Sequence, residues 1–211
     1  MKDYLANEVR NVVVLGHSGA GKSSVIESCL AFTKAIDRYG KANDGTTFLN
    51  FDAEEGKRGL SVYCHLAPVE WKNRKINFID TPGYMDYEGE EITGLTVGDN
   101  ALIVVDAKEG IEAGTERAWK EAAAKRKLPT IFFINKMDDP NASFEKTYQE
   151  LHDKFGKRRQ FLNGRNDPVM PRGSVRRKRV SNAEIWTECF SRDLSDMNRP
   201  IHMPSRHSWY E

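Results

Sequence analysis

The chain has 211 residues and a formal net charge of +1, which allows one α/β domain with a core and shows no overall excess of charge. Its cysteines, Cys29, Cys64 and Cys189, are widely spaced, which argues against a metal cluster or disulfide framework and indicates a reduced, cytoplasmic protein. The first eight residues include acids and no apolar stretch, and no apolar run approaches the ~20 residues that span a bilayer, so we expect neither a secretory signal nor a membrane segment.

An apolar run over 11–15 predicts a strand that leads directly into a glycine-rich segment, 16–23, and a helix is predicted behind it over 24–32. The segment reads Gly-His-Ser-Gly-Ala-Gly-Lys-Ser and matches the phosphate-binding pattern G-x-x-x-x-G-K-[ST]. The glycines let successive backbone N–H groups point at an anion, and the helix N-terminus adds partial positive charge. This context favours a phosphate site over the simpler alternative, a glycine-rich turn with a capping serine.

The side chains of this phosphate loop have separate expected roles. Lys22 is expected to reach the outer phosphates and to act in catalysis, and the Ser23 hydroxyl is expected to bind Mg²⁺. The ring of His17 is expected to matter less than its backbone. The predicted nucleotide contacts in this part of the chain are Gly16, His17, Ser18, Gly19, Ala20, Gly21, Lys22, Ser23 and Ser24.

A long polar segment, 39–59, contains four glycines and is expected to be a functional or mobile loop. It is followed by a strand predicted over 61–66. At the start of that strand, Ser61 is a candidate for a second hydroxyl ligand of Mg²⁺, and the alternative is an ordinary surface serine. His65 lies in the predicted strand and is expected to be a packed histidine rather than a ligand.

The next predicted strand, 75–80, ends in Asp-Thr-Pro-Gly. The Asp80 carboxylate could hold a Mg²⁺-bound water, and the Gly83 backbone N–H could approach a γ-phosphate. The same four residues alone would be an ordinary turn, but a strand end downstream of a phosphate loop favours a functional role. We therefore count Asp80, Thr81, Pro82 and Gly83 as nucleotide contacts, and Ser23, Ser61 and Asp80 as metal ligands.

Two further strands are predicted over 100–106 and 129–135, with the nearly continuous apolar sequence of parallel strands that are buried on both faces. Helices are predicted over 112–127 and from Ser143, a candidate N-cap, through the apolar stripe Phe144, Tyr148, Leu151 and Phe155. Strands that alternate with helices predict an α/β fold of the P-loop NTPase type, a doubly wound, mostly parallel sheet flanked by helices. Its ligand is expected at the carboxyl ends of the strands.

The strand over 129–135 runs into Asn135-Lys136-Met137-Asp138, and this sequence predicts the base of the nucleotide. Guanine presents an N1–H and an exocyclic amine side by side, and the Asp138 carboxylate can accept hydrogen bonds from both. Adenine has an acceptor at N1, so the Asp138 carboxylate would face it without a hydrogen bond. An adenine nucleotide would therefore be rejected. The Lys136 stem can lie over the base, and Asn135 can connect the base to the phosphate loop. The alternative is a plain polar loop.

After Gly156 the sequence changes character. Residues 157–211 hold 12 Lys and Arg against six Asp and Glu, and no helical or alternating period lasts. We expect a nucleotide-binding domain over 1–156 and an irregular, Arg-rich tail over 157–211. The tail is either a disordered basic arm that could contact RNA or an aberrant sequence from truncation or a frame shift.

In this order the motifs resemble the GTP-binding domain of translational GTPases, in particular the elongation factor G group, from about Arg10 to Phe155. The likeness includes 58–62, Arg-Gly-Leu-Ser-Val, which is similar to the family's Arg-Gly-Ile-Thr-Ile at the end of switch I, and 104–107, Val-Val-Asp-Ala. It implies GTP hydrolysis to GDP with Mg²⁺, coupled to the ribosome. It also carries over Lys22 and Ser23 as phosphate and Mg²⁺ ligands, Ser61 as γ-phosphate sensor and Asp138 as guanine reader.

The sequence departs from this family at three positions. Tyr84 stands where the family usually has the histidine that orients the attacking water, Ser61 replaces a threonine, and Gly19 replaces an acidic residue. Tyr84 and Gly19 resemble the elongation factor G-like branch. A phenol can position water but cannot become an imidazolium, so we expect slow hydrolysis, with Lys22, Gly83 and Tyr84 as the catalytic residues.

The last guanine-binding loop of the family has no clear match here, and Gly173-Ser174-Val175 is the nearest candidate. Three functions stay open: a monomeric translational GTPase, a truncated nucleotide-binding remnant that turns over little GTP and does not engage the ribosome, and a GTP-dependent regulatory module. In the regulatory case a partner protein would dock on 39–59 and 84–98.

Overall fold

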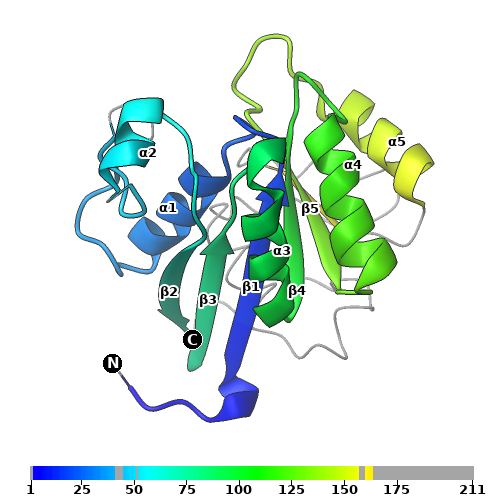
Figure 1. Cartoon of the computed structure of the whole chain (residues 1–211). Helices are drawn as coiled ribbons and strands as arrows, with labels where there is room; N and C mark the ends of the chain where they lie inside the picture. The colour runs from blue at the N-terminus through cyan, green and yellow to red at the C-terminus, as the bar shows by residue number, and fades with distance from the viewer. Residues whose placement is uncertain (1, 41–44, 51, 157–159, 164–211) are drawn as a thin grey trace, which may run out of the picture.

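The computed structural model describes residues 2–40, 45–50, 52–156 and 160–163, and its centre is a six-stranded sheet in the order β2-β3-β1-β4-β5-β6 (Figure 1). β2 runs antiparallel to β3, and the other neighbouring pairs are parallel. The strands are β1 (Val9–Gly16), β2 (His65–Trp71), β3 (Arg74–Asp80), β4 (Asn100–Asp106), β5 (Thr130–Asn135) and β6 (Gln160–Asn163). The predicted α/β class with a mostly parallel, doubly wound sheet is confirmed.

Helices cover both faces of this sheet. Alternate residues of β1 point into two separate cores, Val12 and Val14 into one and Val13 and Leu15 into the other. The helices are α1 (Lys22–Phe32), α2 (Ala53–Arg58), α3 (Glu88–Val97), α4 (Ala113–Trp119), which continues as the π-helical η4 (Lys120–Lys125), and α5 (Phe144–Phe155); η1 (Ala6–Glu8) and η3 (Met85–Tyr87) are short 3₁₀ turns. α1 packs on the first core, and α3, α4 and α5 pack on the second.

Several predicted elements are confirmed with nearly the expected bounds. β4 begins and ends at the predicted residues, and β5 begins one residue later than predicted. The N-cap of α5 is Ser143, whose hydroxyl accepts a hydrogen bond from the Lys146 backbone N–H. The Leu151 side chain on the predicted apolar stripe is fully buried.

The strand predicted over 61–66 is wrong at its start, because β2 begins only at His65. The register pairs His65 with Asp80, the last residue of β3, so residues 61–64 lie beyond the end of the partner strand. Their backbone N–H groups bond to side chains instead: Val62 and Tyr63 donate to the Glu55 carboxylate, and Cys64 donates to Glu90.

Three elements were not foreseen. The segment 39–59, expected to be a loop, contains α2, whose N-cap Asp52 accepts from the backbone N–H groups of Glu54 and Glu55. The segment 84–98 contains α3. β6 pairs with β5 in the part of the chain where no lasting pattern was found. The remainder of the predicted tail, with the candidate loop at 173–175, lies outside the described residues.

Candidate functional site

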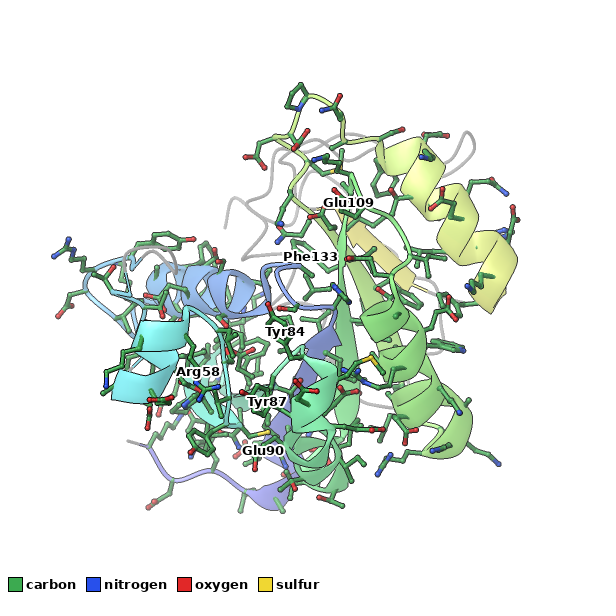
Figure 2. The ribbon with its side chains drawn as sticks, turned by 45° about the horizontal axis from the view of Figure 1, so that its top comes forward. Arg58, Tyr84, Tyr87, Glu90, Glu109 and Phe133 are labelled. Atoms are coloured by element: carbon green, nitrogen blue, oxygen red, sulfur yellow. The ribbon has the colours of Figure 1, made fainter. Side chains whose placement is uncertain are left out.

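A cleft of about 780 Å³ opens at the carboxyl ends of β1 and β3, where the α/β fold predicts the ligand. Three stretches of chain line it: the phosphate loop with the start of α1, the segment from Gly45 to Ser61, and the turn after β3. Lys136 contributes from the end of β5. Figure 2 shows Tyr84 at the centre of this end of the molecule, with Arg58 and Tyr87 to one side.

The phosphate loop has the curled backbone that an anion site requires. Gly16 and Gly21 have φ angles of 138° and 94°, which favour glycine, and a Cβ at Gly16 would lie 2.3 Å from the carbonyl oxygen of Val104. The Lys22 ammonium folds back over the loop and donates to the carbonyl oxygens of Gly16 (3.2 Å) and His17 (3.0 Å). Burial lowers the pKa of Lys22, and the nearby Asp80 carboxylate opposes that shift.

Ser23 and Asp80, both predicted as metal ligands, are in direct contact. The Ser23 hydroxyl donates to Asp80 Oδ2 over 2.5 Å. The other carboxylate oxygen, Oδ1, is buried and has no hydrogen-bond partner among the described residues. Burial raises the pKa of Asp80, with the Ser23 hydrogen bond and then Lys22 acting in the opposite direction. A hydroxyl and an unsatisfied carboxylate oxygen side by side are donors of the type that Mg²⁺ prefers.

The turn after β3 closes against the phosphate loop. The buried Thr81 hydroxyl donates to the carbonyl oxygen of Val14 over 2.7 Å and fixes the turn to β1. Gly83 approaches so closely that a Cβ there would lie 2.4 Å from Lys22 Nζ and 2.7 Å from the Ser18 backbone nitrogen. The backbone of the second motif therefore reaches the lysine of the first, 61 residues earlier in the sequence.

Tyr84 follows Gly83 and lines the cleft, with 44% of its surface exposed. Ser61 lies on the other wall of the same cleft and is half-buried. The structure thus brings Ser61, Tyr84 and the phosphate loop to one space, although they lie far apart in the sequence.

The guanine motif at the end of β5 is only partly in the cleft. The Asn135 side chain donates to the carbonyl oxygen of Ala20 over 2.8 Å, which gives the predicted connection to the phosphate loop. Lys136 adopts a φ of 56° and lines the cleft, and its ammonium lies 2.8 Å from the Asp106 carboxylate. Asp138 is exposed and stands just outside the residues that line the cleft.

Asp106 was not among the predicted site residues. It ends β4, and burial alone would raise the pKa of its carboxyl, but the hydrogen bond from Lys136 and those from the backbone N–H groups of Lys108 and Glu109 outweigh burial and lower it. Asp106 ends a predicted parallel strand next to the one that carries the guanine motif, and this position in the sequence could have indicated a site residue.

The segment that forms the far wall of the cleft is held by buried carboxylates that were also missed. The Glu27 carboxylate accepts from the backbone N–H groups of Gly40 (2.8 Å) and Phe48 (3.0 Å). Glu55 Oε2 lies 3.3 Å from His65 Nε2, and both side chains are buried. His65 is therefore packed, as expected. No sequence pattern distinguishes these glutamates from the solvated ones nearby.

The ring of His17 has a larger part than expected. Its Nδ1 accepts from the Gly114 backbone N–H over 3.3 Å, and its Nε2 lies 3.3 Å from the Glu112 carboxylate. The phosphate loop is thereby joined to the start of α4.

None of the helices in the described part of the chain is long and apolar enough to cross a membrane. Among the same residues, no group of three or more His, Cys, Asp or Glu side chains is arranged to hold a metal ion.

Comparisons with known proteins point to one family. The model of the elongation factor Tu GTP binding domain matches residues 7–196. The chain is 37% identical over 150 residues to the mitochondrial ribosome-releasing factor 2 of Candida dubliniensis, covering 71% of this chain and 18% of that protein. It is 39% identical over 150 residues to the elongation factor G-like protein of Thermotoga maritima, covering 71% and 21%. The chain thus spans about a fifth of the length of these curated relatives.

Solved structures agree with this. A crystal structure of a protein from Thermus thermophilus superposes with a TM-score of 0.68 at 31% identity, covering 72% of this chain and 23% of that one. A bacterial selenocysteine-specific elongation factor, EF-Sec, has a TM-score of 0.58 at 22% identity over 73% and 25%, which shows a shared fold. The chain belongs to the family of elongation factor Tu GTP-binding domains, as a translational GTPase domain of the elongation factor G type.

Proposed function

We propose that this chain binds GTP and GDP in the cleft together with Mg²⁺ and hydrolyses GTP slowly to GDP and phosphate. The observation that carries the proposal is the convergence of Lys22, Gly83 and the Ser23–Asp80 pair at one end of the cleft. Each of these groups suits a different part of a triphosphate: an ammonium for the outer phosphates, a backbone N–H for the γ-phosphate, and oxygen donors for the metal.

Mg²⁺ fits the residues present. Ser23 Oγ and the unsatisfied Asp80 Oδ1 would hold it, directly or through water, and Ser61 lines the same cleft as a further hydroxyl. When bound, the ion would neutralise charge on the β- and γ-phosphate oxygens. The Ser23 hydroxyl donates its proton to Asp80 Oδ2, which leaves the oxygen lone pairs available to coordinate the cation.

The chain's own groups account for binding and for slow turnover. The Lys22 ammonium must exchange the carbonyl oxygens of Gly16 and His17 for phosphate oxygens, and the Gly83 N–H would stabilise charge that develops on the γ-phosphoryl group. Tyr84 stands at the cleft with its phenol available to orient a water. A phenol has no cationic form, so Tyr84 contributes no positive charge to the transition state.

The guanine preference of the proposed site rests on Asn135, Lys136 and Asp138. The most direct test is a titration of the whole chain with a fluorescent GDP analogue, mant-GDP, with excess ATP as competitor. Micromolar or tighter binding that ATP does not displace supports the proposal. Failure to bind either guanine nucleotide, or equal binding of adenine nucleotides, overturns it.

The slow rate is tested by Tyr84→His in a single-turnover phosphate-release assay beside the unaltered chain. Because an imidazole can orient water and also carry positive charge, we expect hydrolysis to rise by about tenfold or more. The affinity for mant-GDP should stay within twofold, because Tyr84 follows the γ-phosphate turn rather than the GDP contacts. If the unaltered chain already hydrolyses GTP at the rate of the variant, Tyr84 does not limit turnover.

We also propose that residues 1–156 are the nucleotide-binding unit, that it is monomeric, and that it works with the ribosome, which the relatives' names and the resemblance support. The proposal of a cytoplasmic location rests on the widely spaced cysteines alone, and the ribosome-releasing factor 2 relative is mitochondrial. The competing function is a nucleotide-holding module with little turnover, which the tyrosine at position 84 favours. GTP turnover measured with and without ribosomes separates the two. Stimulation by ribosomes supports the translational role, and an unchanged rate supports the module.

The basic tail is proposed to contact ribosomal RNA.

A further inference from the structure

A buried ion pair lies directly behind the turn that carries Gly83. Arg117 of α4 and Glu91 of α3 are joined by two contacts to the same carboxylate oxygen, 2.9 Å from Nη2 and 3.1 Å from Nε. Only 11% of the Arg117 side chain and 3% of the Glu91 side chain are exposed. The two helices lie on the same face of the sheet (Figure 1). Neither residue lines the cleft.

The guanidinium also reaches the turn itself. Arg117 Nη2 donates to the carbonyl oxygen of Gly83 over 3.4 Å. Gly83 in turn presses against Lys22 and Ser18, where a Cβ would collide. A continuous line of contacts therefore runs from Glu91 through Arg117 and Gly83 to the phosphate loop. Two helices on one face of the sheet are connected to the position of a single peptide at the cleft.

Both Arg117 and Lys22 act electrostatically on the Glu91 carboxylate. Burial raises the pKa of Glu91, and Arg117, followed by Lys22, opposes that rise. Arg117 and Lys22 thus lie within the field of the same carboxylate, but only Arg117 is in hydrogen-bond contact with it. With Glu91 occupied by Arg117, Lys22 remains directed at the loop carbonyls, from which it can turn to phosphate.

We infer that Arg117 is a positioning residue for the γ-phosphate part of the site: it holds the Gly83 carbonyl, which belongs to the Gly83–Tyr84 peptide, and so restrains the orientation of Gly83, whose own N–H faces the terminal phosphate of GTP. The inference rests on the proposed function and adds a selectivity to it. GDP has no γ-phosphate, so the Arg117 contact stabilises bound GTP and leaves bound GDP unaffected. Arg117 itself touches no substrate.

A purely structural ion pair makes a different prediction. If Arg117 and Glu91 only joined α3 to α4, their removal would change the stability of the fold and affect both nucleotides alike. Buried ion pairs can often be replaced by apolar side chains of similar volume without loss of stability, whereas removal of one partner leaves a buried charge. The double replacement therefore separates positioning from stability.

The test uses the whole chain carrying E91L and R117M together, with E91Q as the matched control. The glutamine keeps an oxygen acceptor for Arg117 and leaves its contact with Gly83 intact. Dissociation constants are measured for mant-GDP and for the non-hydrolysable analogue mant-GppNHp, with the thermal midpoint of each variant as a check on folding. R117K is the conservative variant, because it keeps the charge and a donor.

For the double variant we expect about tenfold weaker binding of mant-GppNHp, in line with the loss of one hydrogen bond to a charged donor. Binding of mant-GDP should stay within twofold, and single-turnover hydrolysis at saturating GTP should fall by about tenfold. E91Q should keep the ratio of the two affinities of the unaltered chain, and R117K should recover it to within about threefold.

Equal weakening of both nucleotides, or no change in either, would overturn the inference. If the double variant melts before binding can be measured, E91Q and R117Q together take its place, because two neutral amides can pair with each other while the shorter glutamine at 117 loses the contact with Gly83. The ratio of the two affinities should then shift against mant-GppNHp as in the double variant, and an unchanged ratio would overturn the inference. Failure of the unaltered chain to bind mant-GDP would overturn the proposed function itself. This outcome is distinct from failure of the inference, because it is seen in the chain without any substitution.

Discussion

At the phosphate end of the cleft the key side chains are buried, whereas at the guanine end they stand at the surface. Lys22 and Asp80 are 6% and 1% exposed. The Lys136 side chain is 45% exposed, and Asp138 is exposed as well. The phosphate end is held by contacts between two motifs, Ser23 with Asp80 and Gly83 with Lys22. The guanine end is held by the ion pair of Lys136 with Asp106 and by the hydrogen bond of Asn135 to the Ala20 carbonyl oxygen.

This difference in burial indicates that the two ends of the cleft contribute to nucleotide binding in different ways. Buried ionic groups interact strongly with a phosphate because water does not screen them, but they lower the stability of the protein without nucleotide. Exposed groups interact more weakly, and their value lies in the selection of the base. Substitutions at the phosphate end should therefore have large effects on affinity, and those at the guanine end should mainly alter which base is bound.

Lys22→Met should have the largest effect. The charge-assisted hydrogen bonds to phosphate are lost, so we expect about 100-fold weaker binding of both GDP and GTP analogue. A buried ammonium is replaced by an apolar side chain, so the thermal midpoint without nucleotide should not fall. Mant-nucleotide titration and thermal unfolding followed by circular dichroism measure both quantities. Unchanged affinity would show that Lys22 keeps its contacts with the loop carbonyls when nucleotide binds.

Asp138→Asn should change the base rather than the phosphates. The amide replaces one carboxylate oxygen with a donor, which would face a donor of guanine, so GDP affinity should fall about 30-fold. Xanthosine diphosphate has a carbonyl in place of the exocyclic amine and should gain affinity. Asp139→Asn is the matched control. The Asp139 carboxylate accepts a hydrogen bond from the Asn141 backbone N–H, and an amide oxygen at this position can accept the same bond. If both variants behave alike, Asp138 does not read the base.

The parts that the sequence predicted well are those encoded by neighbours in the chain. Glycines, lysine and hydroxyl within 16–23 determine the phosphate loop, and the apolar run 100–106 determines a buried strand without reference to distant residues. The connection of Asn135 to the phosphate loop was predictable because both lie at carboxyl ends of parallel strands.

The parts that were missed depend on pairing between distant segments. Arg117 and Glu91 are 26 residues apart, and in the sequence each looks like one of the many solvated charges around it. The start of β2 was misplaced because it is decided by where β3 ends, not by the β-propensity of residues 61–64. Burial of a charge is a property of the folded surroundings, and no local pattern reports it.

Asp80→Asn tests the buried phosphate end of the cleft through the stability of the fold. Burial raises the folded-state pKa of Asp80 above its unfolded value, so the ionised carboxylate destabilises the fold at pH values above the folded-state pKa. The variant without nucleotide should therefore be more stable near neutral pH, by about 1 kcal/mol, a shift of about 2–4 °C for a chain of this size. The same variant should lose the Mg²⁺ dependence of its GDP affinity.

The stabilising effect of Asp80→Asn should decrease with acid in a defined way. As the pH falls from the folded-state pKa toward the lower unfolded value, the carboxyl of the folded chain is protonated and the destabilisation is lost progressively, until it is absent below the unfolded value. The difference in thermal midpoint between Asp80→Asn and the unaltered chain should therefore shrink as the pH is lowered. A difference that grows toward low pH would mean that Asp80 stabilises the fold as a carboxylate, and that the Ser23 hydrogen bond outweighs burial.

Asp106→Asn should have the smallest effect, because the amide loses only the ion pair with the exposed Lys136, while its oxygen can still accept the hydrogen bond from the Lys108 backbone N–H. Loss of a partly exposed ion pair of this kind weakens an interaction by less than about 1 kcal/mol, so GDP and GTP analogue should both bind about threefold more weakly. The two nucleotides should be affected equally, since the base and not the γ-phosphate is involved, which is the opposite of the pattern expected for Arg117.

Salt separates the two ends of the cleft in the same experiment. Exposed charges are screened within about 3 Å at 1 M salt, so the threefold difference between Asp106→Asn and the unaltered chain should vanish there. The far larger difference for Lys22→Met should persist, because its ammonium is buried and poorly screened. If high salt instead removed the Lys22 effect and left the Asp106 effect, the phosphate end would be the open end of the cleft when nucleotide is bound.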